Sequence, residues 1–372
     1  MSAWRWRGSV AMMAVAVGFV IYPLIESGGD VINSDWPAFA TGAKLIVDDP
    51  GHLYDLGVQR HVESEVTGGR TLVTLGIQGI LPFLAPAWVA LIAVPFGLLG
   101  TDLGGRVWIL FGLACLAGGL WLAVRPRPAL TFVPAFASVP TALFLLNAQL
   151  DGLVVLGIGA AVALWTRPYL AGLALGLTLM KPHLVVTLGI ALVLARRWTV
   201  VAGWASAGAA LLAATLALNV RWVFEWLGAA GTTVQPGGRE VDLAHLGTLL
   251  PTGARSPAEA ALGIVATVAV LALAWRRKDE FRAAAAILVA GGIVAALHSL
   301  PTDLVLVAAA LAIWGEARWY DWLLLSVTAA VCALTPAPVP VVAGALVVGW
   351  VCLRAAGLIS ESRRGPAGVS AG

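Results

Sequence analysis

Helix-length apolar stretches separated by short polar intervals dominate the chain. Hydrocarbon about 30 Å thick takes roughly 20 helical residues to cross, whereas a transmembrane barrel shows alternating segments of about ten residues. The pattern therefore predicts an all-α polytopic transmembrane helical bundle of about twelve helices, in one domain spanning residues 1–372. The stretches lie near residues 8–25, 82–99, 107–124, 130–146, 150–166, 169–195, 199–218, 259–275, 283–297, 303–315, 320–334 and 339–357.

The composition agrees with a membrane protein. Residues of the AVILMFWYC set make up 60% of the chain and charged residues 12%, against about 25% charged in soluble domains. The net charge of +3 does not indicate a nucleic-acid partner, because the positive residues sit at helix ends. Cys115, Cys332 and Cys352 lie inside apolar stretches, where cysteine behaves as a small buried hydrophobe. We therefore expect neither a disulfide framework nor a metal site.

The polar intervals give an orientation. Arg5 and Arg7 precede the first stretch, which we interpret as a retained anchor with its N-terminus in the cytoplasm. The longest interval, residues 26–80, carries eight acidic residues against three basic ones and is expected outside. Residues 219–258 form a second predicted outer loop, and residues 360–372 a cytoplasmic tail.

The basic clusters test this orientation. Those near residues 196–197, 276–278 and 363–364 fall at alternate helix ends, as cytoplasmic turns would. Arg125, Arg127 and Arg167 belong on the same side only if the stretch 169–195 consists of two short helices broken at Lys181-Pro182. The number of helices in the first half therefore stays open at this stage.

Asp35 is the first candidate for chemistry. It lies in Ser34-Asp35-Trp36-Pro37, shortly after the first stretch, with Trp36 expected to mark the membrane boundary. A carboxylate placed there can act as a general base on a hydroxyl group. The alternative is an ordinary solvated loop aspartate. The amphipathic stretch that follows, up to Tyr54-Asp55, is interpreted as a short helix lying on the outer surface, or as a loop packed on the bundle.

Lys181 is the second candidate. It interrupts an apolar stretch, and a lysine at mid-membrane costs about 2.5–3.5 kcal/mol unless it faces a polar cavity or a partner. A lysine suits a phosphate or a carboxylate. The alternative is a side chain that extends to the membrane surface.

Two polar turns complete the set. Asn147, Gln149 and Asp151 separate two apolar stretches and suit either sugar hydroxyls or a plain turn. His298 and Asp303 lie in a similar turn, where both can bind a sugar or a phosphate counter-cation. A helix cap explains the aspartate equally well.

Several motifs are missing from the sequence. It contains no GxxxxGK[ST], HExxH, CxxC or GxSxG, so ATP hydrolysis, zinc proteolysis, thiol redox chemistry and serine hydrolysis have no support. There is also no spaced acidic pair of the DxD kind for a metal-bound nucleotide sugar. A nucleotide-sugar donor is therefore not expected.

Taken in order, these segments resemble glycosyltransferase family 87, within the GT-C membrane glycosyltransferases. The motif residues matched span most of the chain, with departures at Leu81 and Ala148, where the family has proline and glycine. The matched residues are Asp35, Phe39, Ala40, Ala43, Leu53, Tyr54, Asp55, Pro82, Gln149, Arg167, Ala171, Gly172, Gly176, Lys181, Pro182, Arg196, Arg197, Trp198, His298, Asp303 and Leu304.

The resemblance implies a membrane hexosyltransferase, similar to polyprenol-phosphate-mannose-dependent α-1,2-mannosyltransferases. Its donor would be a polyprenyl-phosphate sugar, its acceptor a lipid or glycan, and its active site would face outward from a bacterial cell membrane. Asp35 would be the general base of an inverting displacement, and the lipid phosphate the leaving group. Neither metal nor cofactor is implied by this chemistry. Donor-phosphate or sugar binding would fall to Tyr54, Gln149, Lys181, His298 and Asp303.

Two other functions remain open from the sequence. A transporter or flippase of lipid-linked intermediates predicts broken helices in two related halves, and only the break at Lys181-Pro182 is evident. A non-catalytic membrane subunit predicts that the outer acidic residues are dispensable.

Overall fold

The computed structural model describes residues 3–70, 80–125, 129–233, 255–296, 298–336 and 338–359. Over these residues the chain is helical and contains no β-strand, which confirms the all-α membrane bundle. The elements are α1 (Ala3–Ile25), α2 (Gly28–Ile32), α3 (Trp36–Asp48), η1 (Pro50–His52), α4 (Leu56–Val66), α5 (Ala87–Gly97), α6 (Thr101–Val124), α7 (Ala129–Phe136), α8 (Val139–Leu146), α9 (Asp151–Ala163), α10 (Pro168–Leu175), η2 (Gly176–Met180), η3 (Pro182–Val185), α11 (Val186–Leu194), α12 (Trp198–Leu216), α13 (Trp222–Thr233), α14 (Arg255–Arg276), α15 (Phe281–Ala295), η7 (Pro301–Asp303), α16 (Leu304–Trp314), α17 (Trp319–Leu334) and α18 (Val339–Ala355).

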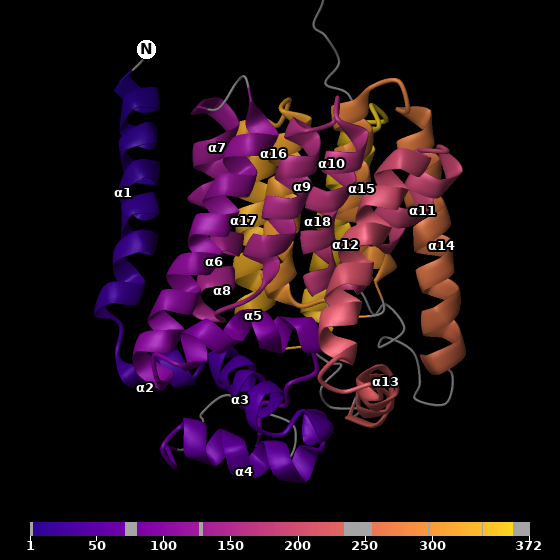
Figure 1. Cartoon of the computed structure of the whole chain (residues 1–372). Helices are drawn as coiled ribbons and strands as arrows, with labels where there is room; N and C mark the ends of the chain where they lie inside the picture. Colours follow the sequence, from indigo (N-terminus) through magenta and orange to yellow (C-terminus); the bar gives the residue numbers. More distant parts are fainter. Residues whose placement is uncertain are drawn as a thin grey trace, which may run out of the picture.

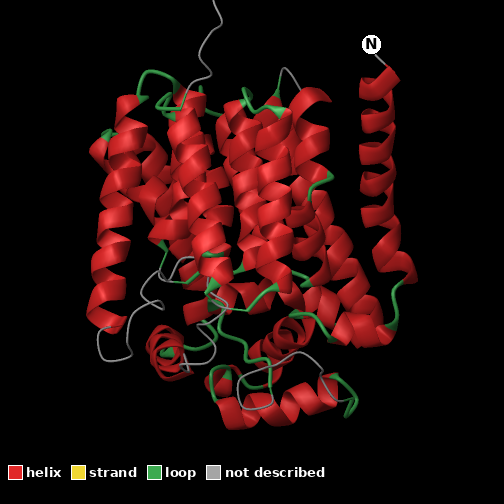
Figure 2. Ribbon diagram, turned by 180° about the vertical axis from the view of Figure 1, so that it is seen from behind, coloured by secondary structure: helices red, strands yellow, loops and turns green. Residues whose placement is uncertain are grey.

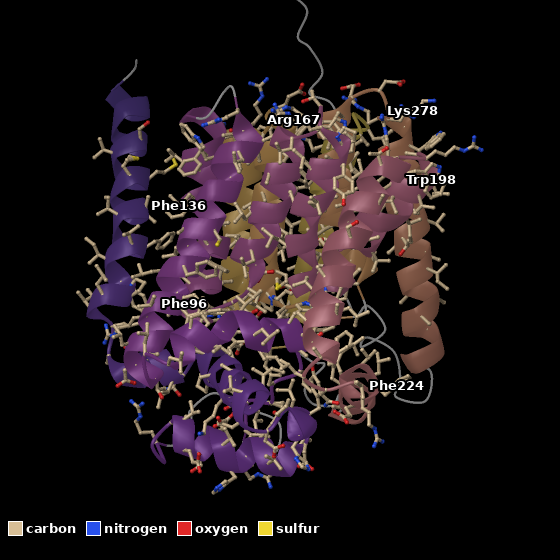
Figure 3. All side chains as sticks on the ribbon, in the orientation of Figure 1. Phe96, Phe136, Arg167, Trp198, Phe224 and Lys278 are labelled. Atoms are coloured by element: carbon tan, nitrogen blue, oxygen red, sulfur yellow. The ribbon has the colours of Figure 1, made fainter. Side chains whose placement is uncertain are left out.

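The bundle has two unlike ends. Helices α6 to α12 and α14 to α18 stand side by side, whereas α2 to α5 and α13 gather at one end, seen from the front and from behind (Figures 1 and 2). Because α3 begins just after Asp35, we call this the Asp35 end. Arg167 and Lys278 lie at the opposite end, together with the start of α1, and we call it the basic end (Figure 3).

The predicted loops lie partly outside the described residues. The described part of the interval 26–80 folds into α2, α3, η1 and α4. Residues 71–79 of this interval, residues 234–254 of the second loop and the tail 360–372 fall outside the described residues.

Helix α16 forms the centre of the core. Every residue from Leu304 to Trp314 is buried, and the helix contacts α6, α7, α8, α9, α15, α17 and α18. Helix α1 is the opposite case, since only 6% of its apolar window is buried inside the protein. A helix that is apolar all round and makes few protein contacts is solvated by lipid in a membrane.

Few of the described helices are long enough to cross a bilayer alone. By length and composition, Gly8–Ile25, Thr101–Val124 and Trp198–Leu216 qualify, and the other apolar helices are shorter. At 1.5 Å per residue, the 11 residues of α16 reach only about 17 Å. The shorter helix α9 begins at Asp151, and Asp303 immediately precedes α16, so polar residues lie within the depth of the bundle.

The apolar stretch 82–99 is used differently from the other stretches. It forms α5, which lies across the Asp35 end rather than upright in the bundle (Figure 1). Its 11 residues extend about 17 Å, too short for a crossing. Instead α5 packs against α3 and α6, so this apolar segment supports the loop region that contains Asp35.

The stretch 169–195 is broken at Lys181-Pro182. This break is the condition under which Arg125, Arg127 and Arg167 lie on the same side as the other basic clusters. Helix α10 and η2 run inward from the basic end, the chain turns at Lys181, and η3 and α11 return to the same end (Figure 1). Proline has no N–H to donate, and it disfavours helix in the residue before it. The guanidinium of Arg197 lies 5.8 Å from the ring centre of Trp165, which confirms that both arms end together.

Glycines allow α6 and α9 to approach closely. A Cβ atom on Gly152 would collide with the carbonyl of Gly112, and one on Gly159 with the carbonyl of Gly119. Small residues at such contacts let helix backbones pack tightly in membranes. The close approach fixes the start of α9, where Gln149 and Asp151 lie, against α6.

Candidate functional site

Polar side chains from four separate segments meet inside the Asp35 end of the bundle. They are supplied by the start of α3, the turn between α8 and α9, the tip of the broken hairpin, and the turn before α16. The set comprises Asp35, Gln149, Asp151, Lys181, His183, His298 and Asp303. We call it the polar cluster.

Asp35 precedes α3 but does not cap it. Its carboxylate makes no capping hydrogen bond, and instead accepts one from the Nε2 amide of Gln149. Its backbone N–H donates to the carbonyl of Asn147 at 3.2 Å. The side chain is half-buried, so the structure favours a positioned carboxylate over a solvated loop aspartate.

The surroundings of Asp35 change its acidity. Burial raises the pKa of its carboxyl to about 6, and the charge of Asp303 adds to the rise, while Lys181 and His298 oppose it. A carboxylate with this pKa is ionised at neutral pH and is a stronger base than a solvated aspartate. Buried carboxyls with shifted pKa values are common at functional sites.

Lys181 points inward and joins two carboxylates. Its Nζ atom lies 2.9 Å from Asp151 Oδ2 and 2.6 Å from Asp303 Oδ1, and its side chain is only 11% exposed. This geometry argues against a lysine that reaches for the membrane surface. One ammonium group therefore holds two carboxyl groups together.

Asp303 serves as both a cap and an ion-pair partner. Its Oδ2 atom accepts the backbone N–H of Leu300 at 2.7 Å, while Oδ1 faces Lys181. The cap expected from the sequence is therefore present, while sugar or phosphate binding by Asp303 stays a prediction. The turn also buries the hydroxyls of Ser299 and Thr302, for which no described group is a hydrogen-bond partner.

Asp151 is a cluster residue that the sequence left as part of a polar turn. It is fully buried at the start of α9, with one oxygen on Lys181 and no hydrogen-bond partner for Oδ1 among the described groups. A buried unpaired carboxylate oxygen is costly and calls for an explanation. The sequence offered one indication of a site at Asp151, namely its position two residues after Gln149, at the start of an apolar helix.

His183 is a cluster residue that sequence reasoning did not single out. Its ring centre lies 6.0 Å from that of His298, so the hairpin tip and the turn before α16 bring two imidazoles together. His298 is exposed and His183 half-buried, which puts the pair at the accessible edge of the polar cluster. Imidazoles bind oxyanions when protonated and hydroxyls when neutral.

The turn that carries Gln149 is strained. Ala148 has a φ of 50°, in the left-handed region that glycine adopts readily and alanine does not. The indole Nε1 of Trp108 donates to the Ala148 carbonyl at 2.8 Å and holds this conformation. The family resemblance placed a glycine at this position, and the backbone explains that preference.

Other predicted residues lie away from the polar cluster. The Tyr54 hydroxyl donates to the carbonyl of Ala85 at 2.9 Å, and its ring packs on Phe83, so Tyr54 supports the loop. Asp55 caps α4 through the N–H groups of Gly57 and Val58. Trp36 is fully buried instead of marking a membrane boundary, and packs on Trp108 behind Asp35.

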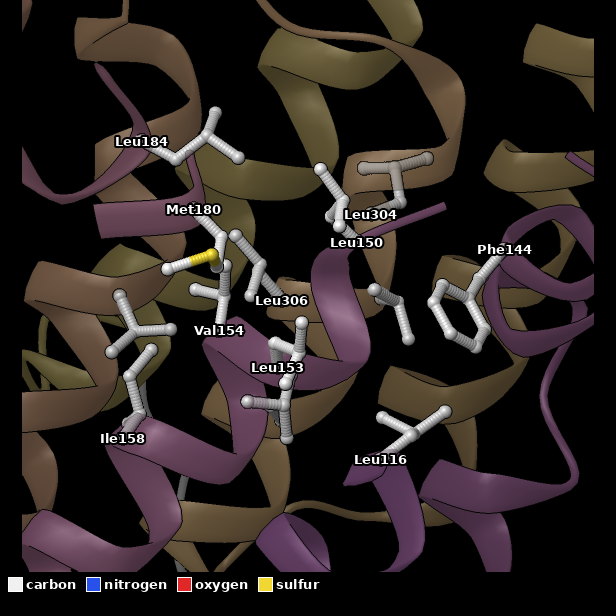
Figure 4. Packing of buried hydrophobic residues seen from close by; sticks show 14 of the residues in the cluster. Leu116, Phe144, Leu150, Leu153, Val154, Ile158, Met180, Leu184, Leu304 and Leu306 are labelled. Atoms are coloured by element: carbon white, nitrogen blue, oxygen red, sulfur yellow. The ribbon is translucent and has the colours of Figure 1, made fainter. Parts of the chain in front are cut away.

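An apolar floor underlies the polar cluster. Leu150, Met180 and Leu304 are immediate sequence neighbours of cluster residues and are buried together with side chains of α6, α8 and α9 (Figure 4). A groove of about 470 Å³ lies nearby between the hairpin and α12, and its lining includes Leu179, Pro182 and Trp204. Polar groups next to an apolar groove suit an amphiphilic ligand.

A second buried ion pair, between Asp321 and Arg354, lies at the basic end. Asp321 accepts hydrogen bonds from Trp350 Nε1 at 2.8 Å, from its own helix start at Arg318 N at 2.8 Å, and from Arg354 at 3.2 Å. The Arg354 guanidinium also lies over the rings of Trp314 and Tyr320. This pair ties α16, α17 and α18 together.

The arrangement suits acid–base chemistry on a hydroxyl next to an anion. The carboxylate of Asp35 can accept a proton, the ammonium of Lys181 is shared by Asp151 and Asp303, and the two imidazoles lie at the accessible edge. The described residues contain no group of three or more histidine, cysteine or acidic side chains arranged to hold a metal ion.

Comparison with known families gives one match. A family model described as glycosyltransferase family 87 matches residues 83–301, more than half of the chain. The matched part contains α5 to α15 and therefore most of the polar cluster. Comparison with curated proteins and with solved structures gave no significant match.

Proposed function

The chain belongs to glycosyltransferase family 87, and from this premise we propose that it transfers a sugar from a polyprenyl phosphate to a hydroxyl of a lipid or glycan acceptor. Membership makes it a membrane glycosyltransferase. The lipid donor, with mannose as the sugar, rests on the resemblance to polyprenol-phosphate-mannose-dependent enzymes. The apolar groove between the hairpin and α12, whose lining includes Pro182 next to Lys181, supports a donor with a lipid chain.

The observation that carries the proposal is the placement of Asp35. Its carboxylate is held by the Gln149 amide, with a pKa near 6, beside the charges of Lys181, His298 and Asp303. In the proposed reaction Asp35 takes the proton of the acceptor hydroxyl, whose oxygen attacks the anomeric carbon. The bond from that carbon to the phosphate oxygen breaks, and its electron pair leaves with the phosphate. The configuration at the sugar inverts.

The roles of the cations follow from charge. The departing phosphate carries negative charge that nearby positive groups stabilise, and they act more strongly where water is excluded. His298 is exposed at the edge of the polar cluster, and Lys181 lies deeper between its two carboxylates. We propose that His298 contacts the phosphate first and that Lys181 sets the local charge.

The orientation is also part of the proposal. Basic residues after the C-terminal end of α9, before the start of α12 and at the C-terminal end of α14 belong on the cytoplasmic side by the positive-inside rule. The Asp35 end would then face the outside of a bacterial cell membrane. A polyprenyl-linked donor reaches that face within the bilayer.

The test uses purified protein in vesicles with polyprenyl phospho-[14C]mannose and a membrane lipid extract as acceptor. Asp35→Asn should lower transfer by about 10²–10⁴-fold, the usual contribution of a general base. Asp49→Asn is the matched control, because Asp49 is an exposed acid of the same loop that pairs with His52.

The outcomes separate the alternatives. Normal turnover by Asp35→Asn would remove the proposed base. Movement of labelled lipid across the vesicle without any glycosidic product would identify a transporter of lipid-linked intermediates. Loss of transfer in both variants would indicate a general role of loop charge.

A further inference from the structure

Helix α13 at the Asp35 end has two unlike faces. On one face Trp222 is buried and its ring meets that of Trp88 edge to face, with centres 5.3 Å apart. Trp226 on the same side donates its Nε1 hydrogen to the carbonyl of Leu84 at 2.7 Å. This face is docked on the protein.

The other face is apolar and uncovered by the described residues. Phe224 and Leu227, one turn apart, are 79% and 57% exposed, and Val220 in the preceding turn is 74% exposed. Large apolar side chains grouped in this way on an outer surface mark contact with a protein or a membrane. We call these three residues the α13 patch.

The orientation of α13 distinguishes between these partners. Both views show the helix end on, so its axis lies across the upright bundle (Figures 1 and 2). It follows α12 after a short turn, and Leu212 of α12 and Leu218 of the turn are exposed to the bundle's surroundings. The α13 patch thus continues the lipid-facing surface of a helix long and apolar enough to cross the membrane.

We propose that α13 is an interfacial helix whose patch inserts among the lipid chains of the leaflet at the Asp35 end. An in-plane helix with an apolar face outward and aromatic residues near the boundary fits this position. The exposed Arg221 beside the patch suits lipid headgroups, because its stem can lie on apolar surface while the guanidinium reaches water.

The anchor has a consequence for the loop around Asp35. The Asn219 amide, at the start of this segment, donates to the carbonyl of Pro50 at 2.9 Å, and Trp226 holds Leu84. Pro50 follows α3, and Leu84 precedes α5. Lipid contact of α13 therefore sets the height of both helices relative to the bilayer. This inference does not depend on the proposed reaction.

The test measures the surroundings of the patch with a fluorescent label in vesicles. Single cysteines replace Phe224 or, as a second variant, Leu227, and each is labelled in the full chain. The native cysteines are buried, and the protein without an added cysteine gives the background. Val265→Cys, exposed on α14, is the lipid reference, and His61→Cys, exposed on α4, is the water reference.

Quenching decides the result. Lipids that carry a nitroxide on the acyl chain should quench the labels at 224 and 227 several-fold more than iodide does, as at 265. Stronger quenching by iodide, as at 61, would place the patch in water and overturn the proposal. Labels quenched by neither reagent would show that protein covers the patch, and would overturn it equally.

Discussion

The two buried ion clusters of this bundle differ in how their charges balance. At the basic end, Asp321 faces one guanidinium and both of its oxygens are hydrogen-bonded. At the Asp35 end, Lys181 serves two carboxylates, and Asp151 Oδ1 has no partner among the described groups. The one-to-one pair holds helices together and leaves no carboxylate oxygen unpaired, although the buried Nε of Arg354 has no partner among the described groups. The unbalanced cluster retains charge and hydrogen-bonding capacity, which is what a binding site needs.

The largest expected effect follows from removing the shared ammonium. Lys181→Met leaves Asp151 and Asp303 facing each other, and breaking a buried ion pair costs about 3–5 kcal/mol. We expect transfer to be lost and the free energy of unfolding, measured by denaturant titration in micelles, to fall by about 3 kcal/mol or more. The triple variant with Asp151→Asn and Asp303→Asn should recover stability without transfer. If it stays equally unstable, charge imbalance is not the cause.

The next effect compares one carboxylate at each end. Asp321→Asn leaves Arg354 without its counter-charge and should cost about 1.5–3 kcal/mol, the value of hydrogen bonds to charged groups. Asp151→Asn leaves a one-to-one pair of Lys181 with Asp303, so the cost should stay below about 1 kcal/mol. Activity should show the reverse order, with transfer per folded molecule impaired only by Asp151→Asn. An equal loss of unfolding free energy in the two variants would mean that both clusters serve to stabilise the fold.

A smaller effect is expected from pH. Asp35 has a pKa of about 6 and must be ionised to accept a proton, so transfer should rise about tenfold per pH unit up to pH 6 and then level off. Gln149→Leu removes a hydrogen bond to the charged form and should move this limb to higher pH. Initial rates across the range in Asn147→Ala protein serve as the control. If the pH dependence of transfer is the same in Gln149→Leu as in the native protein, Gln149 does not influence the pKa of Asp35.

The smallest effect concerns the turn before Gln149. Ala148→Gly relieves a left-handed backbone, and should stabilise the protein by about 0.5–1 kcal/mol without loss of transfer. The thermal midpoint in micelles measures this change. Ala161→Gly inside α9 is the matched control and should destabilise, because glycine weakens a helix interior. A lower midpoint for Ala148→Gly would show that the turn is not strained.

Much of the architecture followed from the spacing of apolar and basic residues. The helical bundle and the loop helices after Asp35 could be predicted, because membrane helices must satisfy their backbone internally. The break at Lys181-Pro182 was one of two alternatives, because proline interrupts a helix but does not always end it. The position of α5 could not. An 11-residue apolar helix has the same local signal whether it stands in a bundle or lies across its end, and only its packing on α3 decides.

The same limit applies to the polar cluster. Asp35 and Lys181 stood out because a charge beside or within an apolar stretch is costly. Their pairing with Gln149, Asp151 and Asp303 spans up to 122 residues and depends on the close approach of α6 and α9, which no local pattern encodes. Trp36 was misplaced at a membrane boundary for a related reason, since an aromatic residue near a helix end has the same signal when it packs inside.

The broken hairpin from α10 to α11 leaves from the basic end and comes back to it. An element of this kind adds no net crossing, so every later helix keeps the same direction through the membrane whatever the length of its two arms. The lysine at its tip is therefore carried on an element whose length does not set the direction of the helices that follow it.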